Sequence, residues 1–111
     1  SGVNGLSELL TKTEIENGLH ASLAETSLML ALKPELVGDE RPHEGTNLKI
    51  PEGWSLEGNA PTAWITEDLS KSGVIGDSRG ANALLGKDLK ELLINHWFKL
   101  IMNLMQSDWP N

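Results

Sequence analysis

The sequence predicts a chain of the α/β class, with helices on either side of a middle segment of loops and short strands. Two observations support this prediction. Apolar residues recur at helical spacing toward both ends of the chain, and the segment between them is rich in Gly, Pro, Asn and Asp. Because 111 residues make one small domain, we expect a single hydrophobic core.

Residues 5–17 predict one short amphipathic helix or helical turn. Leu6, Leu9 and Leu10 lie at near-helical spacing, and the pair Asn17-Gly18 is a common helix stop.

A second helix is predicted within residues 20–33, with its regular part at about residues 23–32. Ser22 and Glu25 match the capping-box pattern at its start, and Pro34 ends it. The interior is apolar on nearly every side, so we expect more than one neighbour to bury it.

The middle segment, residues 38–79, predicts loops with two short strands at residues 63–65 and 74–75. Loops of this length are uncommon in compact domains, and they are usually functional or stabilised by a contact. Residues 73–80 resemble a glycine-rich turn that could present backbone N–H groups to an anion. The interpretation we favour is a strand-to-helix turn in which Ser78 caps the last helix.

The last segment, about residues 80–106, predicts a long amphipathic helix. Its apolar residues repeat at helical spacing, and charged or polar side chains occupy the opposite face. Such a helix would be about 40 Å long. Gly86 costs about 1 kcal/mol there relative to Ala, so we expect it to mark a close contact.

The composition limits the possible partners. A net charge of -7 repels phosphate backbones and anionic lipid surfaces, so we expect neither nucleic acid nor membrane as a partner. There is no cysteine, so any metal ligand must be His, Asp or Glu. No apolar run is long enough to cross a membrane, and we expect a cytoplasmic protein.

His20 is the main candidate for chemistry. It lies at a loop-helix junction five residues before Glu25, and an imidazole there can take or give a proton near neutral pH. Glu25 could orient the ring or stabilise its charged form. The structural alternative is that Glu25 only caps the helix and that His20 only packs. With His43 and His96 scattered and no ligand-spaced carboxylate pair, the chain predicts no closed metal site of its own.

Two stretches resemble one known family. Residues 20–37 read HASLAETSLMLALKPELV and resemble the HAGxxETS-type block and following alkPelV helix of the creatininase (creatinine amidohydrolase) family. Residues 72–86 read SGVIGDSRGANALLG and resemble the sGvxGdPrxAtaekG block that opens the final helix of that family. The order and separation of the blocks also agree, and the resemblance covers residues 20–104.

The resemblance implies a creatininase-like three-layer α/β/α fold with a mainly parallel sheet, often assembled as a homo-oligomer. Residues 1–111 would be an incomplete C-terminal portion of that domain. The implied activity is metal-dependent hydrolysis of a C–N bond in a cyclic or linear amide, with two Zn or Mn ions in a complete site. His20 matches the family histidine thought to shuttle a proton, and Glu25 matches the acidic residue of the same motif.

Departures from the family pattern set the expected partners. The family's metal ligands lie in an N-terminal half that this chain does not contain, so the chain alone should bind no metal and be inactive. The expected partners are such an N-terminal half or identical subunits, with a small amide as substrate. Ser22 replaces the motif glycine, and Glu16 replaces a tryptophan of creatinine-hydrolysing members, which disfavours creatinine.

Two alternatives to an enzyme portion remain at this point. One is a non-catalytic interaction module related to creatininase, which would use its long helix and Trp-rich loops to bind partner subunits. The other is an unrelated small helical domain with chance motif matches, which predicts a monomer with a buried, satisfied His20. Exposed apolar surface would favour the first of these two.

Overall fold

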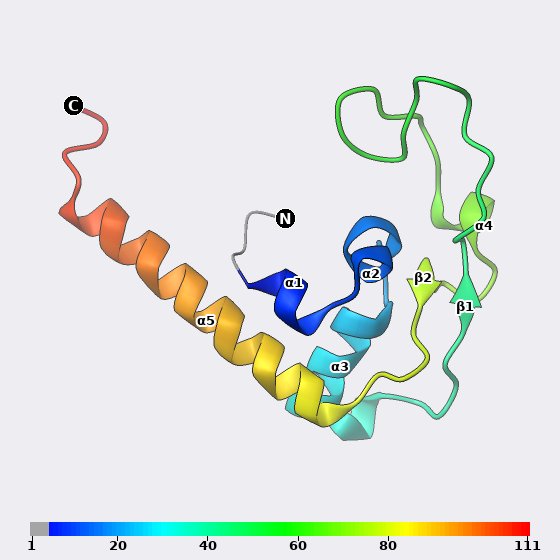
Figure 1. The fold of residues 1–111 in the computed structure, drawn as a ribbon, viewed down its shortest axis with the longest axis horizontal. Helices are drawn as coiled ribbons and strands as arrows, with labels where there is room; N and C mark the ends of the chain where they lie inside the picture. The colour runs from blue at the N-terminus through cyan, green and yellow to red at the C-terminus, as the bar shows by residue number, and fades with distance from the viewer. Residues whose placement is uncertain (1–4) are drawn as a thin grey trace.

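The computed structural model describes residues 5–111 of the chain. Within them the chain forms five α-helices, one short 3-10 helix and one two-stranded antiparallel sheet (Figure 1). In chain order the elements are α1 (Leu6–Leu9), α2 (Lys12–Asn17), α3 (Leu23–Leu32), η1 (Pro34–Leu36), β1 (His43–Glu44), α4 (Thr66–Leu69), β2 (Gly76–Asp77) and α5 (Ala83–Gln106). None of these helices combines the length and apolar character needed to span a membrane.

Helices α3 and α5 pack closely against each other at Gly86. A Cβ atom added to Gly86 would lie 1.8 Å from the carbonyl oxygen of Ser27. Ser27 is fully buried, and its hydroxyl accepts a hydrogen bond from the backbone N–H of Asn82 at 3.1 Å. The close contact predicted at Gly86 is therefore confirmed.

The apolar core around this contact is small. Its buried hydrophobic residues are Leu10, Val74, Ile75 and Leu89. Helix α3 contacts α5 along one side, yet Leu32 is 52% exposed, so the expected burial of α3 on several sides is not achieved within residues 5–111.

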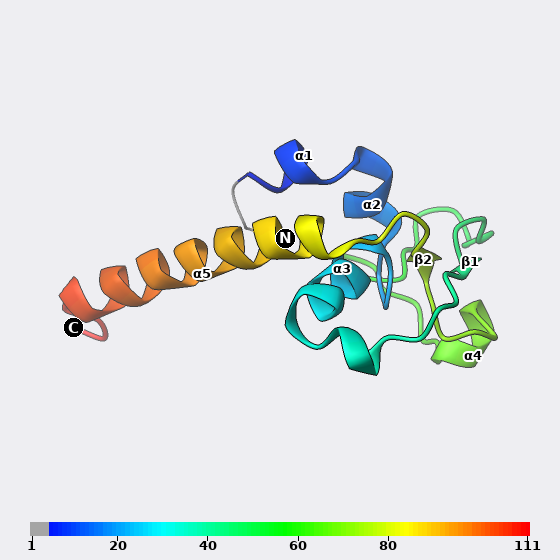
Figure 2. The ribbon, with the colours of Figure 1, turned by 90° about the horizontal axis from the view of Figure 1, so that it is seen from below.

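Helix α5 extends beyond the rest of the chain (Figures 1 and 2). Its 24 residues correspond to about 36 Å. The radius of gyration is 16.4 Å, whereas a compact domain of this length would have about 13 Å. The difference follows from the distal half of α5, which extends away from the other elements of residues 5–111.

The single helix predicted for residues 5–17 is wrong, because the segment forms α1 and α2. Leu10 is extended between them, with φ of -118° and ψ of 148°. The hydroxyl of Thr11 then accepts a hydrogen bond from the N–H of Glu14 at 3.2 Å and caps the second helix. A Thr side chain at this position starts a new helix and interrupts the leucine spacing.

The strands also differ from prediction. No strand forms at residues 63–65, where the indole N–H of Trp64 donates to the carbonyl of Leu56 at 3.0 Å. The second predicted strand is displaced to β2, which pairs with β1 in antiparallel register, with His43 opposite Asp77. A mainly parallel sheet is not present within residues 5–111.

The long helix begins later than predicted and ends at the predicted residue. Asn82 is its N-cap, and the Asn82 side chain accepts a hydrogen bond from the N–H of Leu85 at 2.8 Å. The predicted cap, Ser78, is buried and donates its hydroxyl to the carbonyl of Pro42 at 2.7 Å. The hydroxyl of Ser78 is therefore used to join two loops.

The Gly86 contact leads to a stability prediction. Helix propensity alone would make Gly86→Ala more stable by about 1 kcal/mol. Because the new methyl group would overlap the Ser27 carbonyl, we expect a net loss of about 2 kcal/mol or more. Urea unfolding followed by circular dichroism measures this loss. Lys87→Ala, at an exposed neighbouring position, should change stability by less than about 0.5 kcal/mol. A Gly86→Ala protein more stable than wild type would contradict the packing described here.

Candidate functional site

The candidate site is built where residues 18–22 run beside residues 75–77. The backbone N–H groups of Leu19 and His20 donate to the carbonyl of Ile75 at 2.9 and 3.2 Å, and the N–H of Ile75 donates back to the carbonyl of His20 at 2.9 Å. Ile75 is 1% exposed, whereas His20 is exposed. The backbone of His20 is therefore fixed while its ring is accessible.

Ala21, the residue after His20, has a left-handed backbone with φ of +49°. This conformation is unfavourable for a residue with a Cβ atom, and it persists where surrounding bonds hold it. Here the N–H of Ala21 donates to Oε2 of Glu25 at 2.6 Å, and the carbonyl of Ala21 accepts from the hydroxyl of Thr26 at 2.9 Å. Two side chains of α3 therefore hold the turn that follows His20.

The predicted capping box is wrong in its hydrogen bonds, although α3 starts where predicted. Ser22 is the N-cap residue, but its side chain makes no cap hydrogen bond. The hydroxyl of Ser22 donates to Oε2 of Glu14 at 2.8 Å, and Oε1 of Glu14 accepts from the N–H of Ala24 at 3.4 Å. Glu25 binds the N–H of Ala21 instead of that of Ser22. The Ser22 hydroxyl therefore binds the buried Glu14 carboxylate of α2 and does not cap α3.

His20 and Glu25 lie at the same loop-helix junction and both are exposed. In the part of the chain that the structure describes, their side chains form neither a hydrogen bond nor an ion pair with each other. Glu25 instead borders a hollow of about 240 Å³ together with Met29 and Leu36. The structure thus brings the two predicted residues to one place without pairing them.

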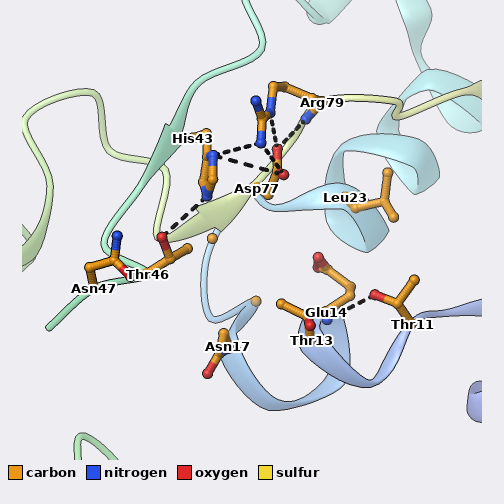
Figure 3. A pocket seen from close by; sticks show the side chains of 12 residues that line it. Thr11, Thr13, Glu14, Asn17, Leu23, His43, Thr46, Asn47, Asp77 and Arg79 are labelled. Carbon is orange, nitrogen blue, oxygen red and sulfur yellow. Dashed lines mark hydrogen bonds and ion pairs between the residues drawn. The ribbon is translucent and has the colours of Figure 1, made fainter.

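A second polar cluster lies in a cleft of about 540 Å³ (Figure 3). Arg79 donates from Nε and Nη2 to the two carboxylate oxygens of Asp77, each at 2.8 Å. Nη2 of Arg79 also lies 2.7 Å from Nδ1 of His43, and Nε2 of His43 lies 3.2 Å from the hydroxyl of Thr46. The pairing of β1 with β2 places His43 beside Asp77.

These distances define the hydrogen-bond roles in the cluster. A guanidinium has only donors, so Nδ1 of His43 must accept from Arg79 and the ring proton must be on Nε2, toward Thr46. The hydrogen bonds from Arg79 lower the pKa of Asp77 from 3.8 to about 2, and the same carboxylate raises the pKa of Arg79. The two charges therefore largely neutralise each other.

Sequence reasoning missed this cluster. In the sequence His43 stands apart from the other histidines, and Asp77 and Arg79 fall within the predicted glycine-rich turn. A carboxylate and a guanidinium two residues apart in a glycine-rich turn are a local signal for such an ion pair. The approach of His43 depends on strand pairing with Asp77, 34 positions further along the chain, which no local pattern reveals.

The described residues do not fit the metal pair implied by the resemblance. Within residues 5–111 no group of three His, Asp or Glu side chains could hold a metal ion. His43 uses Nδ1 for Arg79, and His96 lies on α5 in an edge-to-face contact with Trp97.

Comparison with protein families found one matching family, described as Creatininase: creatinine amidohydrolase, which matches residues 2–101. Comparison with curated proteins found no match. Comparison with solved structures found no match either.

The pairing of Asp77 with Arg79 predicts a pH dependence. Because the pKa of Asp77 is lowered in the folded protein, its contribution to the free energy of unfolding is present above about pH 4 and is lost as pH falls toward about 2. At pH 7 we expect Asp77→Asn to lose at most about 1 kcal/mol, since the pair is solvent-exposed. Its stability should also change less than that of the wild type between pH 4 and pH 2, in urea unfolding at a series of pH values.

The partner variant tests the cause. Arg79→Gln should reduce the pH dependence as Asp77→Asn does, and combining the two should add little. Parallel stability curves for wild type and Asp77→Asn would show that the carboxylate is not stabilised in the folded state.

Proposed function

The chain belongs to the creatininase family, and on that premise we propose that it forms part of an amidohydrolase acting on the C–N bond of a cyclic or linear amide. The observation that supports this most is the state of His20. Both its backbone N–H and its backbone carbonyl form hydrogen bonds with Ile75, while its ring is exposed at the start of α3. The family match also removes the alternative of an unrelated helical domain with chance motif matches.

Amide hydrolysis needs a group that moves one proton. The attacking water loses a proton as its oxygen bonds to the carbonyl carbon, and the departing nitrogen gains one as the C–N bond breaks. An imidazole can carry this proton between the two sites. We assign the role to His20, because its ring is exposed while its backbone is fixed.

Glu25 has a supporting role in this proposal. Its carboxylate accepts the N–H of Ala21 at 2.6 Å and so holds the left-handed turn next to His20. A loss of this bond would release the turn and allow the His20 ring to change direction. Glu25 therefore positions the proton carrier, and its exposed carboxylate can also stabilise the charged form of the ring.

The remaining parts of the site are assigned to another segment. Because the described residues do not fit a metal pair, we propose that the Zn or Mn ligands come from an N-terminal half of a creatininase-like chain or from another subunit. The same segment would complete a three-layer α/β/α fold. No step of the proton transfer proposed for His20 depends on the identity of the metal.

Reconstitution tests this proposal. The chain alone, and the chain mixed with the N-terminal half of a creatininase-family enzyme, are assayed for bound metal and for hydrolysis of a formamide, a linear amide and creatinine. We expect metal and hydrolysis only in the mixture. His20→Ala should retain the metal and lose about 100-fold or more in rate, as expected for loss of a general acid-base group.

His96→Ala is the matched control, since it removes a histidine from α5 and should leave the rate unchanged. A mixture that binds no metal and hydrolyses none of the three amides would overturn the proposal. Equal rates for His20→Ala and wild type would remove His20 from the mechanism.

A second function, as a non-catalytic assembly module, is favoured by the exposed face of α5. Large apolar side chains with exposed fractions of 44–74% follow one another along its distal half: Ile94, Trp97, Phe98, Leu100, Ile101, Leu104 and Met105. A hollow of about 520 Å³ lies between this face and α3. Contiguous apolar surface of this kind marks interaction sites in soluble proteins.

Substitution on this face tests the assembly role. Trp97→Glu places a charge in the centre of the face and should abolish association with a second copy or with the N-terminal half, measured as solution mass by light scattering. Lys99→Glu introduces the same side chain at an exposed position two residues further along α5, and this variant should associate as the wild type does. Assembly without hydrolysis would favour the module over the enzyme. A chain that stays monomeric and binds no N-terminal half would contradict both.

A further inference from the structure

Glu14 is a buried carboxylate that the proposed function does not use. It lies on α2 and is 8% exposed. Among the described residues it forms no ion pair with a basic side chain. Figure 3 shows its side chain rising from α2 toward the start of α3, where Leu23 is labelled. A buried carboxylate is costly unless hydrogen bonds compensate it, so its bonds indicate what it holds in place.

Those hydrogen bonds connect Glu14 to Asp77 of β2 through the hydroxyl of Ser22. The hydroxyl of Ser22 has one proton, and its shortest bond runs to Oε2 of Glu14 at 2.8 Å. Its lone pairs are then available to accept the N–H of Asp77 at 3.0 Å. A single relay of hydrogen bonds therefore extends from the carboxylate of α2 to the backbone of β2.

Two glycines enclose this relay. A Cβ atom on Gly18 would lie 2.2 Å from Oε1 of Glu14, and one on Gly76 would lie 2.3 Å from the hydroxyl of Ser22. Gly76 also has φ of +138°, which few other residues adopt. Glu14 and Ser22 thus occupy space that only glycine neighbours leave open, so the relay is built into the packing.

The relay lies next to the backbone of His20. Ser22 follows His20 by two residues, and Asp77 follows Ile75, the bonding partner of His20, by two residues. Because His20 and Ile75 pair antiparallel, Ser22 and Asp77 are not opposite each other, and their bond is a side-chain cross-link between the same two segments, beside the His20–Ile75 pair. Sliding of one segment along the other would break both.

We propose that Glu14 is a positioning residue for His20: acting through Ser22, its carboxylate fixes the register between residues 19–22 and 75–77 and so fixes the place from which the ring acts. The catalytic part of this inference rests on the proposed function. The competing explanation is that Glu14 only caps α3 through the N–H of Ala24.

Amide hydrogen exchange on the chain alone separates the two explanations. Glu14→Gln keeps the shape of the side chain but replaces one carboxylate oxygen with an NH2 group, which is a donor. The variant therefore cannot accept hydrogen bonds from both the Ser22 hydroxyl and the Ala24 N–H through separate oxygens. We expect the N–H of Ile75, which binds the carbonyl of His20, to exchange at least tenfold faster relative to the N–H of Leu89 in α5. Glu16→Gln on the same helix, where Glu16 is exposed and pairs with Lys12, should leave this ratio unchanged.

Ser22→Ala is the second variant, because it breaks the relay and leaves the Glu14 cap in place. It should speed hydrogen exchange at the N–H of Ile75 as Glu14→Gln does, and leave exchange at the N–H of Ala24 unchanged. In the double variant, exchange at Ile75 should be no faster than in either single variant. Acceleration of Ala24 but not Ile75 in Glu14→Gln would reduce Glu14 to a helix cap. Equal acceleration of Ile75 and Leu89 would reduce it to a residue of general stability. Either result overturns the proposal.

The reconstituted mixture tests the catalytic consequence. Glu14→Gln should lower kcat about tenfold with little change in KM, and it should have no further effect when His20 is already Ala. Independent, multiplying effects of the two substitutions would show that Glu14 does not act through His20. An inert mixture would instead remove the proposed function, while the exchange ratio still decides whether Glu14 fixes the backbone of His20.

Discussion

The close approach of α5 to α3 at Gly86 is the contact on which the rest of the described chain depends. It brings the start of α5 within hydrogen-bond distance of Ser27, whose hydroxyl accepts the N–H of Asn82. Five residues earlier on both segments, the hydroxyl of Ser22 accepts the N–H of Asp77. Two serines of the α3 segment thus hold both ends of the turn between β2 and α5. The backbone hydrogen bonds between His20 and Ile75 lie next to the contact of Ser22 with Asp77.

Local patterns in the sequence predicted the two principal helices well. The bounds of α3 and the end of α5 follow from apolar spacing and from polar or proline punctuation, which act within one or two helical turns. The predictions were wrong where a group distant in sequence formed the hydrogen bond that the local pattern assigned to a nearby group. Ser22 matches a capping box in sequence, but the buried carboxylate of Glu14 holds its hydroxyl. Thr11 likewise divides a leucine-rich segment that spacing alone suggests is continuous.

The candidate site was predictable to a different degree. The sequence indicates His20 and Glu25 by their place at a loop-helix junction and by the motif resemblance, and the structure adds the left-handed turn at Ala21 between them. The cluster around Asp77 could be foreseen only in its Arg79 half, since those two residues are close in sequence. His43 joins it by strand pairing, and no local signal predicts the partner of a two-residue strand. The contacts that hold the site together are thus mostly non-local.

The distal half of α5 has a thermodynamic consequence. An isolated helix of about 12 to 15 residues is only marginally stable in water, and helices in proteins owe most of their stability to packing. This half of α5 has an apolar face that the elements of residues 5–111 leave largely exposed. Any surface that covers it would therefore stabilise the helical state itself as well as bury the face. Association at this end of the chain and folding of this end would then be a single coupled equilibrium, with a heat-capacity change larger than docking of a preformed helix would produce.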